Sequence, residues 1–139
     1  MSKAIENLSE AQRYAMSIRP KVGGFPYLAE VLRSAGVTHN QWHLPSCQSL
    51  YLTKYGPVVS QGIPLVTGIC EVAKFDREAL IQALRTDQDG KSTFPEFLQS
   101  TWKAGVVRYD VDFEKRTCSY FGTSGESYLE KYPAVALTK

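Results

Sequence analysis

The chain has 139 residues, enough for a single domain spanning residues 1–139 that buries about two-thirds of its unfolded surface. Its composition, 43% hydrophobic and 22% charged, is that of an ordinary globular protein. Sixteen basic and 14 acidic residues give a net charge of +2, so bulk electrostatics provide no basis for binding nucleic acid or an anionic membrane.

The sequence also lacks the signals of export and of disulfide bonding. No apolar run approaches the roughly 20 residues that cross a bilayer, and the polar amino-terminal segment lacks the apolar centre of a secretory signal. These features predict a cytoplasmic protein. The three cysteines, Cys47, Cys70 and Cys118, are an odd and widely spaced set that predicts neither a disulfide framework nor a metal centre, and no cofactor is expected.

In the first half of the chain, apolar residues recur at helical spacing. They predict helices at about residues 3–17 and 25–35, the first followed by a proline and the second by a glycine. Residues 37–44 and 49–53 then read as a pair of strands separated by turn formers. Residues 58–72 are apolar but interrupted by glycine and proline, which favours one or two short strands there.

The second half repeats this order. Residues 76–86 form a predicted helix with Asp76 as its N-cap, and a Thr-Phe-Pro-Glu capping-box pattern opens another helix over residues 93–105. In residues 105–122 Val107, Tyr109, Val111 and Phe113 alternate with Arg108, Asp110, Asp112 and Glu114. This alternation predicts a hairpin with one buried face and one solvated polar face. Residues 127–131 are assigned as a short terminal helix.

These elements predict a two-layer α+β fold, with about four helices packed on an antiparallel or mixed sheet. Phe-Pro occurs at 25–26 and 94–95, and Ala-Gly-Val at 35–37 and 104–106, both with an offset of 69 residues (94 − 25 = 69). One interpretation is a duplicated helix–helix–strand–strand unit, and the other is generic helix punctuation. The two units would span residues 3–56 and 75–125.

A first candidate binding site involves two histidines. His39 and His43 share one face of the predicted strand, Trp42 lies on the other, and Cys47 follows shortly. A small-ligand pocket or a Cys–His nucleophilic pair could use these three groups. The alternative is that both histidines are ordinary surface residues, because a zinc site would need further ligands that the sequence does not supply.

A second candidate is the loop Arg-Pro-Lys-Val-Gly-Gly at residues 19–24, directly before a predicted helix. Arg19, Lys21 and the free backbone N–H groups of the helix could receive a phosphate or carboxylate. The alternative is a connector whose charges are solvated.

A third candidate is a degenerate calcium loop at residues 85–96. Asp87, Asp89 and Glu96 fall at ligand positions of an EF-hand, but Arg85 occupies the first position, where an oxygen ligand is required. The alternative is a polar turn between two helices, in which Glu96 completes the capping box.

Four blocks of the chain resemble one known family. They read RPKVGGFPYLAEVLRSAGVT, WHLPSCQSLYLT, STFPEFLQSTWKAGVVRYDVDF and YFGTSGESYLEKYPAV. The resemblance is to the YdfO/YbcV-like family of small bacterial and prophage-encoded proteins, some of which carry the label "phage envelope protein", and it covers residues 4–135. It implies a compact α+β domain with helices packed on a sheet, and it implies no activity, cofactor or catalytic residue.

The sequence therefore favours a non-enzymatic, cytoplasmic accessory protein that binds another macromolecule or itself, in a prophage or stress context. The abundance of tyrosine, with eight residues, and the near-neutral charge support this hypothesis, since an exposed sheet face with tyrosines can bind a partner. The competing hypothesis is a small-ligand protein or enzyme that uses the His39, His43 and Cys47 groups or the loop at 19–24. A deep pocket that joins these groups would favour it.

Overall fold

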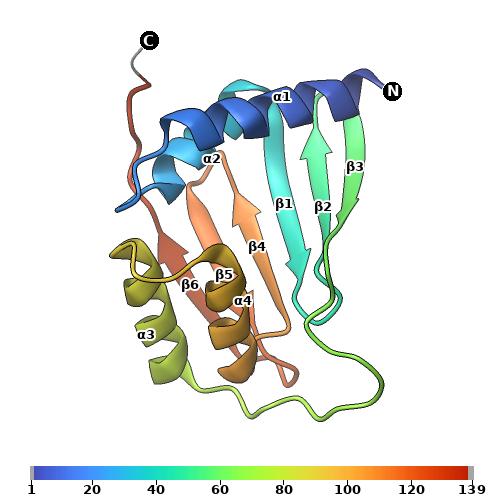
Figure 1. The fold of residues 1–139 in the computed structure, drawn as a ribbon, viewed down its shortest axis with the longest axis vertical. Helices are drawn as coiled ribbons and strands as arrows, with labels where there is room; N and C mark the ends of the chain where they lie inside the picture. The colour runs from blue at the N-terminus through green and yellow to red at the C-terminus, as the bar shows by residue number, and fades with distance from the viewer. Residues whose placement is uncertain (1, 138–139) are drawn as a thin grey trace.

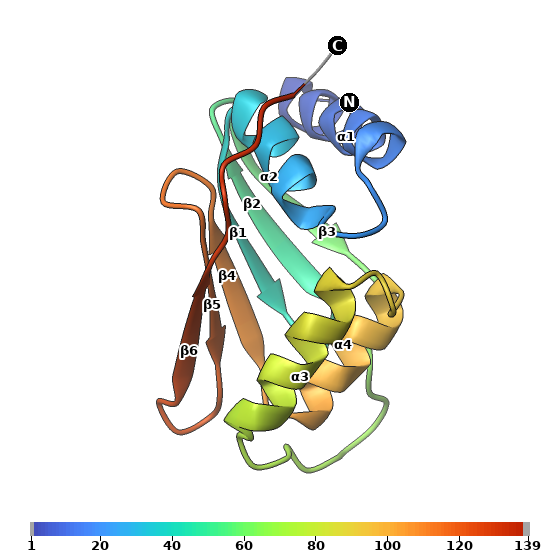
Figure 2. The same cartoon turned by 90° about the vertical axis from the view of Figure 1, so that its left-hand side faces the viewer.

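A computed structural model describes residues 2–137 and contains four helices and six strands, the α+β fold that the sequence predicts (Figure 1). The elements in chain order are α1 (Lys3–Ile18), α2 (Phe25–Ser34), β1 (Val37–His43), β2 (Gln48–Thr53), β3 (Gly56–Gln61), α3 (Arg77–Gln88), α4 (Phe94–Lys103), β4 (Arg108–Asp112), β5 (Thr117–Phe121) and β6 (Ser127–Lys131). The strands form one antiparallel sheet in the order β3-β2-β1-β4-β5-β6. All four helices lie on one face of this sheet (Figure 2).

The prediction of a terminal helix at residues 127–131 is wrong, because this segment is strand β6. It pairs with β5 along its whole length, with Tyr128 opposite Tyr120 and Glu130 opposite Cys118. Five residues are too few to separate a helical period from a strand period, and pairing with a neighbour decides the outcome. The apolar stretch 58–72 contains the end of one strand, β3, followed by an irregular loop.

Two helices begin at residues that the sequence identifies as caps. The Asp76 side chain accepts a hydrogen bond from the Ala79 N–H, at 3.0 Å. At the start of α4 the Thr93 hydroxyl accepts from the Glu96 N–H, at 3.3 Å, and the Glu96 carboxylate accepts from the Thr93 N–H, at 2.8 Å. This reciprocal pair is the predicted capping box.

Replacing the cap of α4 should have a measurable cost. We expect Thr93→Ala to lower the free energy of unfolding by about 1 kcal/mol, because the substitution leaves a helix N–H without its acceptor. Thr67→Ala, in the exposed loop after β3, is the control and should change it by less than about 0.5 kcal/mol. Urea unfolding of both variants checks this, and equal midpoints for the two would contradict the role of the cap.

The core lies between the helices and the inner face of the sheet, which is the face they cover. Small residues on α1 let that helix approach closely, whereas α3 and α4 contribute larger side chains. The helix residues buried there are Leu8, Ala11, Ala15, Ala29, Val31, Leu32, Leu80, Ala83, Leu84, Phe97, Leu98 and Thr101. The buried residues of the sheet's inner face are Val37, Asn40, Ser49, Tyr51, Tyr109, Val111, Cys118 and Tyr120. Strand alternation places all of these on one side of the sheet.

The two halves of the chain have the same element order, two helices followed by three strands, and meet where β1 pairs with β4. The predicted units contained two strands each, and the structure adds a third. Six residues with left-handed backbone form three pairs with the same offset of 69 residues. These pairs are Gly36 and Gly105, Cys47 and Arg116, and Gly56 and Gly125. The two halves therefore turn the chain at corresponding positions.

Candidate functional site

The sheet face opposite the helices is the candidate site, and we call it the open face. No helix within residues 2–137 covers it (Figure 2). Strand pairing arranges its side chains in three rows, each crossing all six strands. From β3 to β6 the rows are Pro57, Leu52, His39, Asp112, Thr117 and Lys131; Val59, Leu50, Gln41, Asp110, Ser119 and Leu129; and Gln61, Gln48, His43, Arg108, Phe121 and Ser127.

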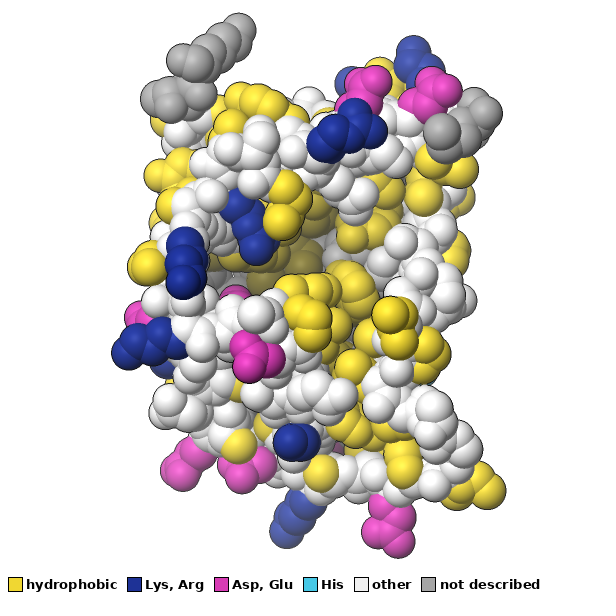
Figure 3. Space-filling view, viewed as in Figure 1, with side chains coloured by type: hydrophobic (Ala, Val, Ile, Leu, Met, Phe, Trp, Pro, Cys, Tyr) yellow, Lys and Arg dark blue, Asp and Glu magenta, His cyan; other side chains and the backbone are white. Residues whose placement is uncertain are grey.

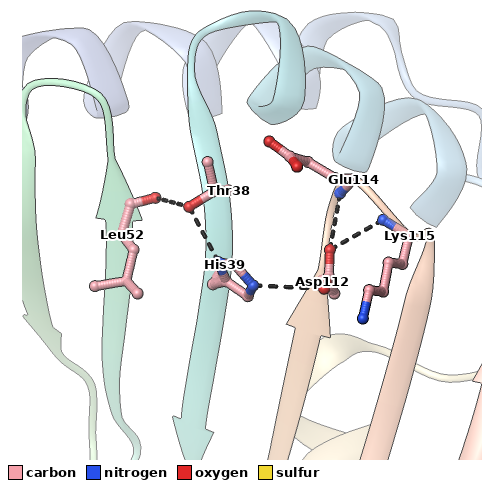
Figure 4. A network of polar contacts seen from close by, with 6 residues as sticks. All are labelled: Thr38, His39, Leu52, Asp112, Glu114 and Lys115. Atoms are coloured by element: carbon pink, nitrogen blue, oxygen red, sulfur yellow. Dashed lines mark hydrogen bonds and ion pairs between the residues drawn. The ribbon is translucent and has the colours of Figure 1, made fainter.

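An ion pair links the two halves of the chain on this face. The His39 Nε2 lies 3.4 Å from the Asp112 Oδ2, across the pairing of β1 with β4 (Figure 4). The other ring nitrogen, Nδ1, lies 3.1 Å from the Thr38 hydroxyl, which donates to the Leu52 carbonyl at 3.2 Å. The His39 ring is thus oriented by strands on both sides.

The Asp112 carboxylate has a second, structural role. Its Oδ1 accepts the backbone N–H groups of Glu114 and Lys115, at 3.0 and 2.9 Å, and so closes the turn between β4 and β5 (Figure 4). An aspartate commonly stabilises a turn in this way. With His39 47% exposed at its side chain, the pair is a solvated surface contact of small energetic worth.

The remaining charges at the centre of the open face are also paired. The Arg108 Nε donates to Asp110 Oδ1 at 3.1 Å, and the Arg108 guanidinium lies 4.4 Å from the centre of the Phe121 ring. Cation–π contact and ion pairing together hold this arginine flat against the sheet. The centre of the face therefore combines both signs of charge in neutralised pairs.

Apolar side chains flank this polar centre on β2 and β3. Leu52 is 37% exposed and Val59 is 58% exposed, and they lie on one face with Leu50 and Pro57. We call these four residues the apolar strip. A depression of about 320 Å³ lies on the opposite side of the centre, and its lining includes His39, Asp112, Thr117, Ser119 and Leu129. A flat face with an apolar strip and paired charges suits contact with another protein surface.

The structure separates the predicted His and Cys residues. His39 and His43 share the open face as predicted, but four strand residues hold them about 13 Å apart. The His43 Nδ1 lies 2.9 Å from the Ser46 hydroxyl. Cys47 is buried in the core cluster, where burial raises the pKa of its thiol and its Sγ contacts the Leu44 carbonyl. No pocket unites these three groups in the described part of the chain.

The predicted anion loop joins the two halves of the chain. Arg19 and Lys21 are exposed, and the Gly23 N–H in the same loop donates to the Gln88 carbonyl at the end of α3, at 3.0 Å. Gly24 occupies the N-cap position of α2 and has no side chain to cap it. The loop therefore acts as a connector, and its two cations project from the surface.

The calcium-loop alternative does not fit the geometry. Helix α3 continues to Gln88, so Arg85 and Asp87 lie within the helix and not in a loop. The Glu96 carboxylate is engaged by the Thr93 N–H in the capping box. Within residues 2–137, no group of three or more His, Cys, Asp or Glu side chains is placed to hold a metal ion. The polar turn with a completed cap, the alternative interpretation, is the one observed.

A polar cluster that sequence reasoning missed joins α3 to β6 on the helix side. Glu130 forms an ion pair with Arg85 and accepts hydrogen bonds from the Gln88 amide and the Tyr128 hydroxyl, at 2.8 and 2.9 Å. Burial alone would raise the pKa of Glu130, but these donors outweigh it and hold the pKa below its usual value. The assignment of residues 127–131 to a helix concealed this cluster, because only a strand brings Glu130 to α3.

The lowered pKa of Glu130 predicts a pH-dependent contribution to stability. We expect Glu130→Gln to be less stable than the wild type at pH 7, where the folded protein gains from the ionised carboxylate. This difference should persist down to about 4.5, the unperturbed value, and narrow as the pH falls through the lower folded-state pKa. Urea unfolding between pH 7 and 3 measures it, with Glu71→Gln in the exposed loop as control. A difference that stays constant with pH would contradict the assignment.

No helix within residues 2–137 has both the length and the apolar character needed to cross a membrane. Residues 16–131 match the protein family described as "Protein of unknown function (DUF1398)". The chain is 57% identical over 135 residues to the uncharacterized protein Rv2012 of Mycobacterium tuberculosis, a match that covers 97% of this chain and 82% of the relative. Identity and coverage are the same for the uncharacterized protein Mb2035 of Mycobacterium bovis. The chain therefore belongs to the DUF1398 family of proteins of unknown function.

Proposed function

We propose that this protein acts without catalysis, by binding another protein on the open face of its sheet. The observation that supports the proposal is the uncovered face, with its apolar strip at β2 and β3 beside a centre of paired charges. Contact with a partner would remove the exposed parts of Leu52 and Val59 from water. The central ion pairs are already neutralised, so they add less desolvation cost than isolated charges would.

The setting of this activity is a further proposal. We infer a cytoplasmic protein from the polar amino-terminal segment and from the unpaired cysteine pattern. A prophage context is proposed from the resemblance of the four sequence blocks to the YdfO/YbcV-like family. Nucleic acid is a less suitable partner, because the face balances Arg108 and Lys131 with Asp110 and Asp112.

A binding experiment with a matched pair of variants tests the open face. Wild-type protein is immobilised and exposed to a lysate of a bacterium that encodes it, and sedimentation velocity tests self-association. Val59→Asp places a charge in the apolar strip on an edge strand, whereas Ile63→Asp, 89% exposed in the following loop, adds the same charge outside the face. We expect Val59→Asp to weaken partner binding at least tenfold and Ile63→Asp to leave it unchanged.

Two results would overturn the proposal. One is wild-type protein that captures no partner and sediments as a monomer at high concentration. The other is a partner whose affinity is the same for wild type and Val59→Asp. Thermal unfolding of both variants confirms that lost binding is not lost folding.

A further inference from the structure

The opposite, helix-covered face of the sheet has a hollow at its centre. The α1–α2 pair and the α3–α4 pair cover the two ends of the sheet (Figures 1 and 2). The space-filling view shows the surface hollowed between the two pairs, with hydrophobic side chains around the depression (Figure 3). Because the pairing of β1 with β4 lies at the middle of the sheet, the inner-face residues of these strands lie beneath this region.

A run of aromatic rings crosses the inner face there. Tyr109 stacks on Trp42, with ring centres 6.1 Å apart, and contacts Tyr120 at 5.5 Å. Trp42 also meets Phe94 edge to face, with ring centres 5.3 Å apart. Phe94 is 45% exposed at the start of α4, whereas Tyr109 is only 6% exposed. The rings thus lead from the surface to a buried tyrosine.

The hydroxyl of Tyr109 has no hydrogen-bond partner within residues 2–137, although the residue is more than nine-tenths buried. In the same part of the chain, no fully enclosed side-chain oxygen or nitrogen lacks a partner. The Tyr109 hydroxyl must therefore border space that solvent can reach, and the hollow is such a space on its side of the sheet. An unpaired polar group at an otherwise apolar site is costly unless water or a ligand satisfies it.

The surroundings define what this hydroxyl can bind. Burial raises the pKa of Tyr109 and Tyr120 well above the usual value, so both phenols stay protonated and able to donate. The half-buried Asp87 carboxylate lies near both tyrosines and would repel an anion, while Arg19 near Asp87 opposes a cation. Aromatic walls with one free donor suit a flat, uncharged molecule that has an acceptor oxygen.

The geometry points to a site in this hollow for a small, neutral, planar aromatic molecule with a carbonyl oxygen, which accepts a hydrogen bond from the Tyr109 hydroxyl. This site is separate from the proposed protein-binding function, because it lies on the other face of the sheet. Tyr51 and Tyr120, close enough to influence Tyr109 electrostatically, flank it from β2 and β5.

Fragment binding to the full chain tests the site. Acetophenone, benzamide and coumarin are titrated into nitrogen-15-labelled protein, and amide and indole signals are followed by NMR. Fragments of this size reach dissociation constants on the order of 1 mM. We expect shifts at the Trp42 indole and at neighbours of Tyr109. α-Methylstyrene, which replaces the acetophenone carbonyl by a carbon of the same shape, should bind several-fold more weakly, and benzoate should not bind.

The matched variants remove a single hydroxyl group. Tyr109→Phe should weaken acetophenone binding about three- to tenfold, the worth of one hydrogen bond, and leave α-methylstyrene binding unchanged. Because that hydroxyl has no partner in the protein, the variant should fold normally. Tyr55→Phe, at a ring that lies beside Lys3 and Lys54, is the control and should bind as wild type does.

Three results would each overturn the inference. They are the absence of shifts around the hollow with any of the three carbonyl fragments, equal acetophenone affinity of Tyr109→Phe and wild type, and shifts confined to another place. The groove between α1 and α2, lined by residues that include Tyr14 and Leu137, is the most informative alternative place. Val59→Asp should bind the fragments normally, which separates this outcome from that of the protein-binding experiment.

Discussion

Gly105→Ala is expected to lower the free energy of unfolding by about 2–5 kcal/mol. Gly105 joins α4 to β4 with a φ of +87°, a left-handed conformation that costs a side-chain-bearing residue about 1–2 kcal/mol. A Cβ there would also lie 2.6 Å from the Phe75 Cα and 2.7 Å from the Lys74 carbonyl carbon and oxygen. Backbone atoms cannot rotate aside, so overpacking adds about 1–3 kcal/mol.

Two other glycines separate the strain of the backbone from the clash. Gly125→Ala imposes a similar φ, +83°, with nothing within 4 Å of the new Cβ, and should cost only the conformational part. Gly36→Ala, at the corresponding position of the first half, meets only the Lys54 side chain, which can move. Urea unfolding should rank Gly105→Ala as the most destabilised of the three. Equal losses for Gly105→Ala and Gly125→Ala would show that the contact with residues 74 and 75 is unimportant.

Leu80→Ala should lower the free energy of unfolding by about 2–5 kcal/mol. Leu80 lies on the inner face of α3 and has no exposed surface. Truncation removes its apolar contacts and leaves a cavity that the surrounding helices and sheet fill only partly. Because alanine has the highest helix propensity, the loss reports packing and not helix formation.

The control for this cavity is an aliphatic residue of similar size in solvent. Ile63→Ala removes comparable apolar atoms from a residue that is 89% exposed, and should change the free energy of unfolding by less than about 0.5 kcal/mol. Chemical denaturation of both variants gives the comparison. If Leu80→Ala cost as little as Ile63→Ala, α3 would not be packed on the sheet as described.

We infer that the two halves of the chain arose by duplication within one domain, with units at about residues 3–56 and 75–125. The common offset of 69 residues in the left-handed positions supports this inference. So does the sheet, in which residues 39, 41 and 43 pair with residues 112, 110 and 108, an arrangement consistent with a two-fold relation between β1 and β4. The later repeat strand, β6, departs from this offset by one residue, since Tyr120 pairs with Tyr128 where Tyr51 pairs with Val58.

The local features of this protein followed from the sequence. The cap at Asp76, the capping box at Thr93 and the helical spacing of apolar residues act within a few neighbouring residues, so they can be interpreted without the fold. Alternation along β4 likewise assigned Tyr109 to the buried side and Asp112 to the wet side before any neighbour was known. The α+β class followed from these elements together.

The tertiary structure alone decided which elements meet. Alternation defines two faces of a strand but not its neighbour or its register, so the pairing of His39 with Asp112, 73 residues later, could not be predicted. Strand β6 exists because β5 offers a partner along its whole length. The hollow above Tyr109 arises because two helix pairs cover the ends of one sheet, a consequence of packing between residues far apart in the chain.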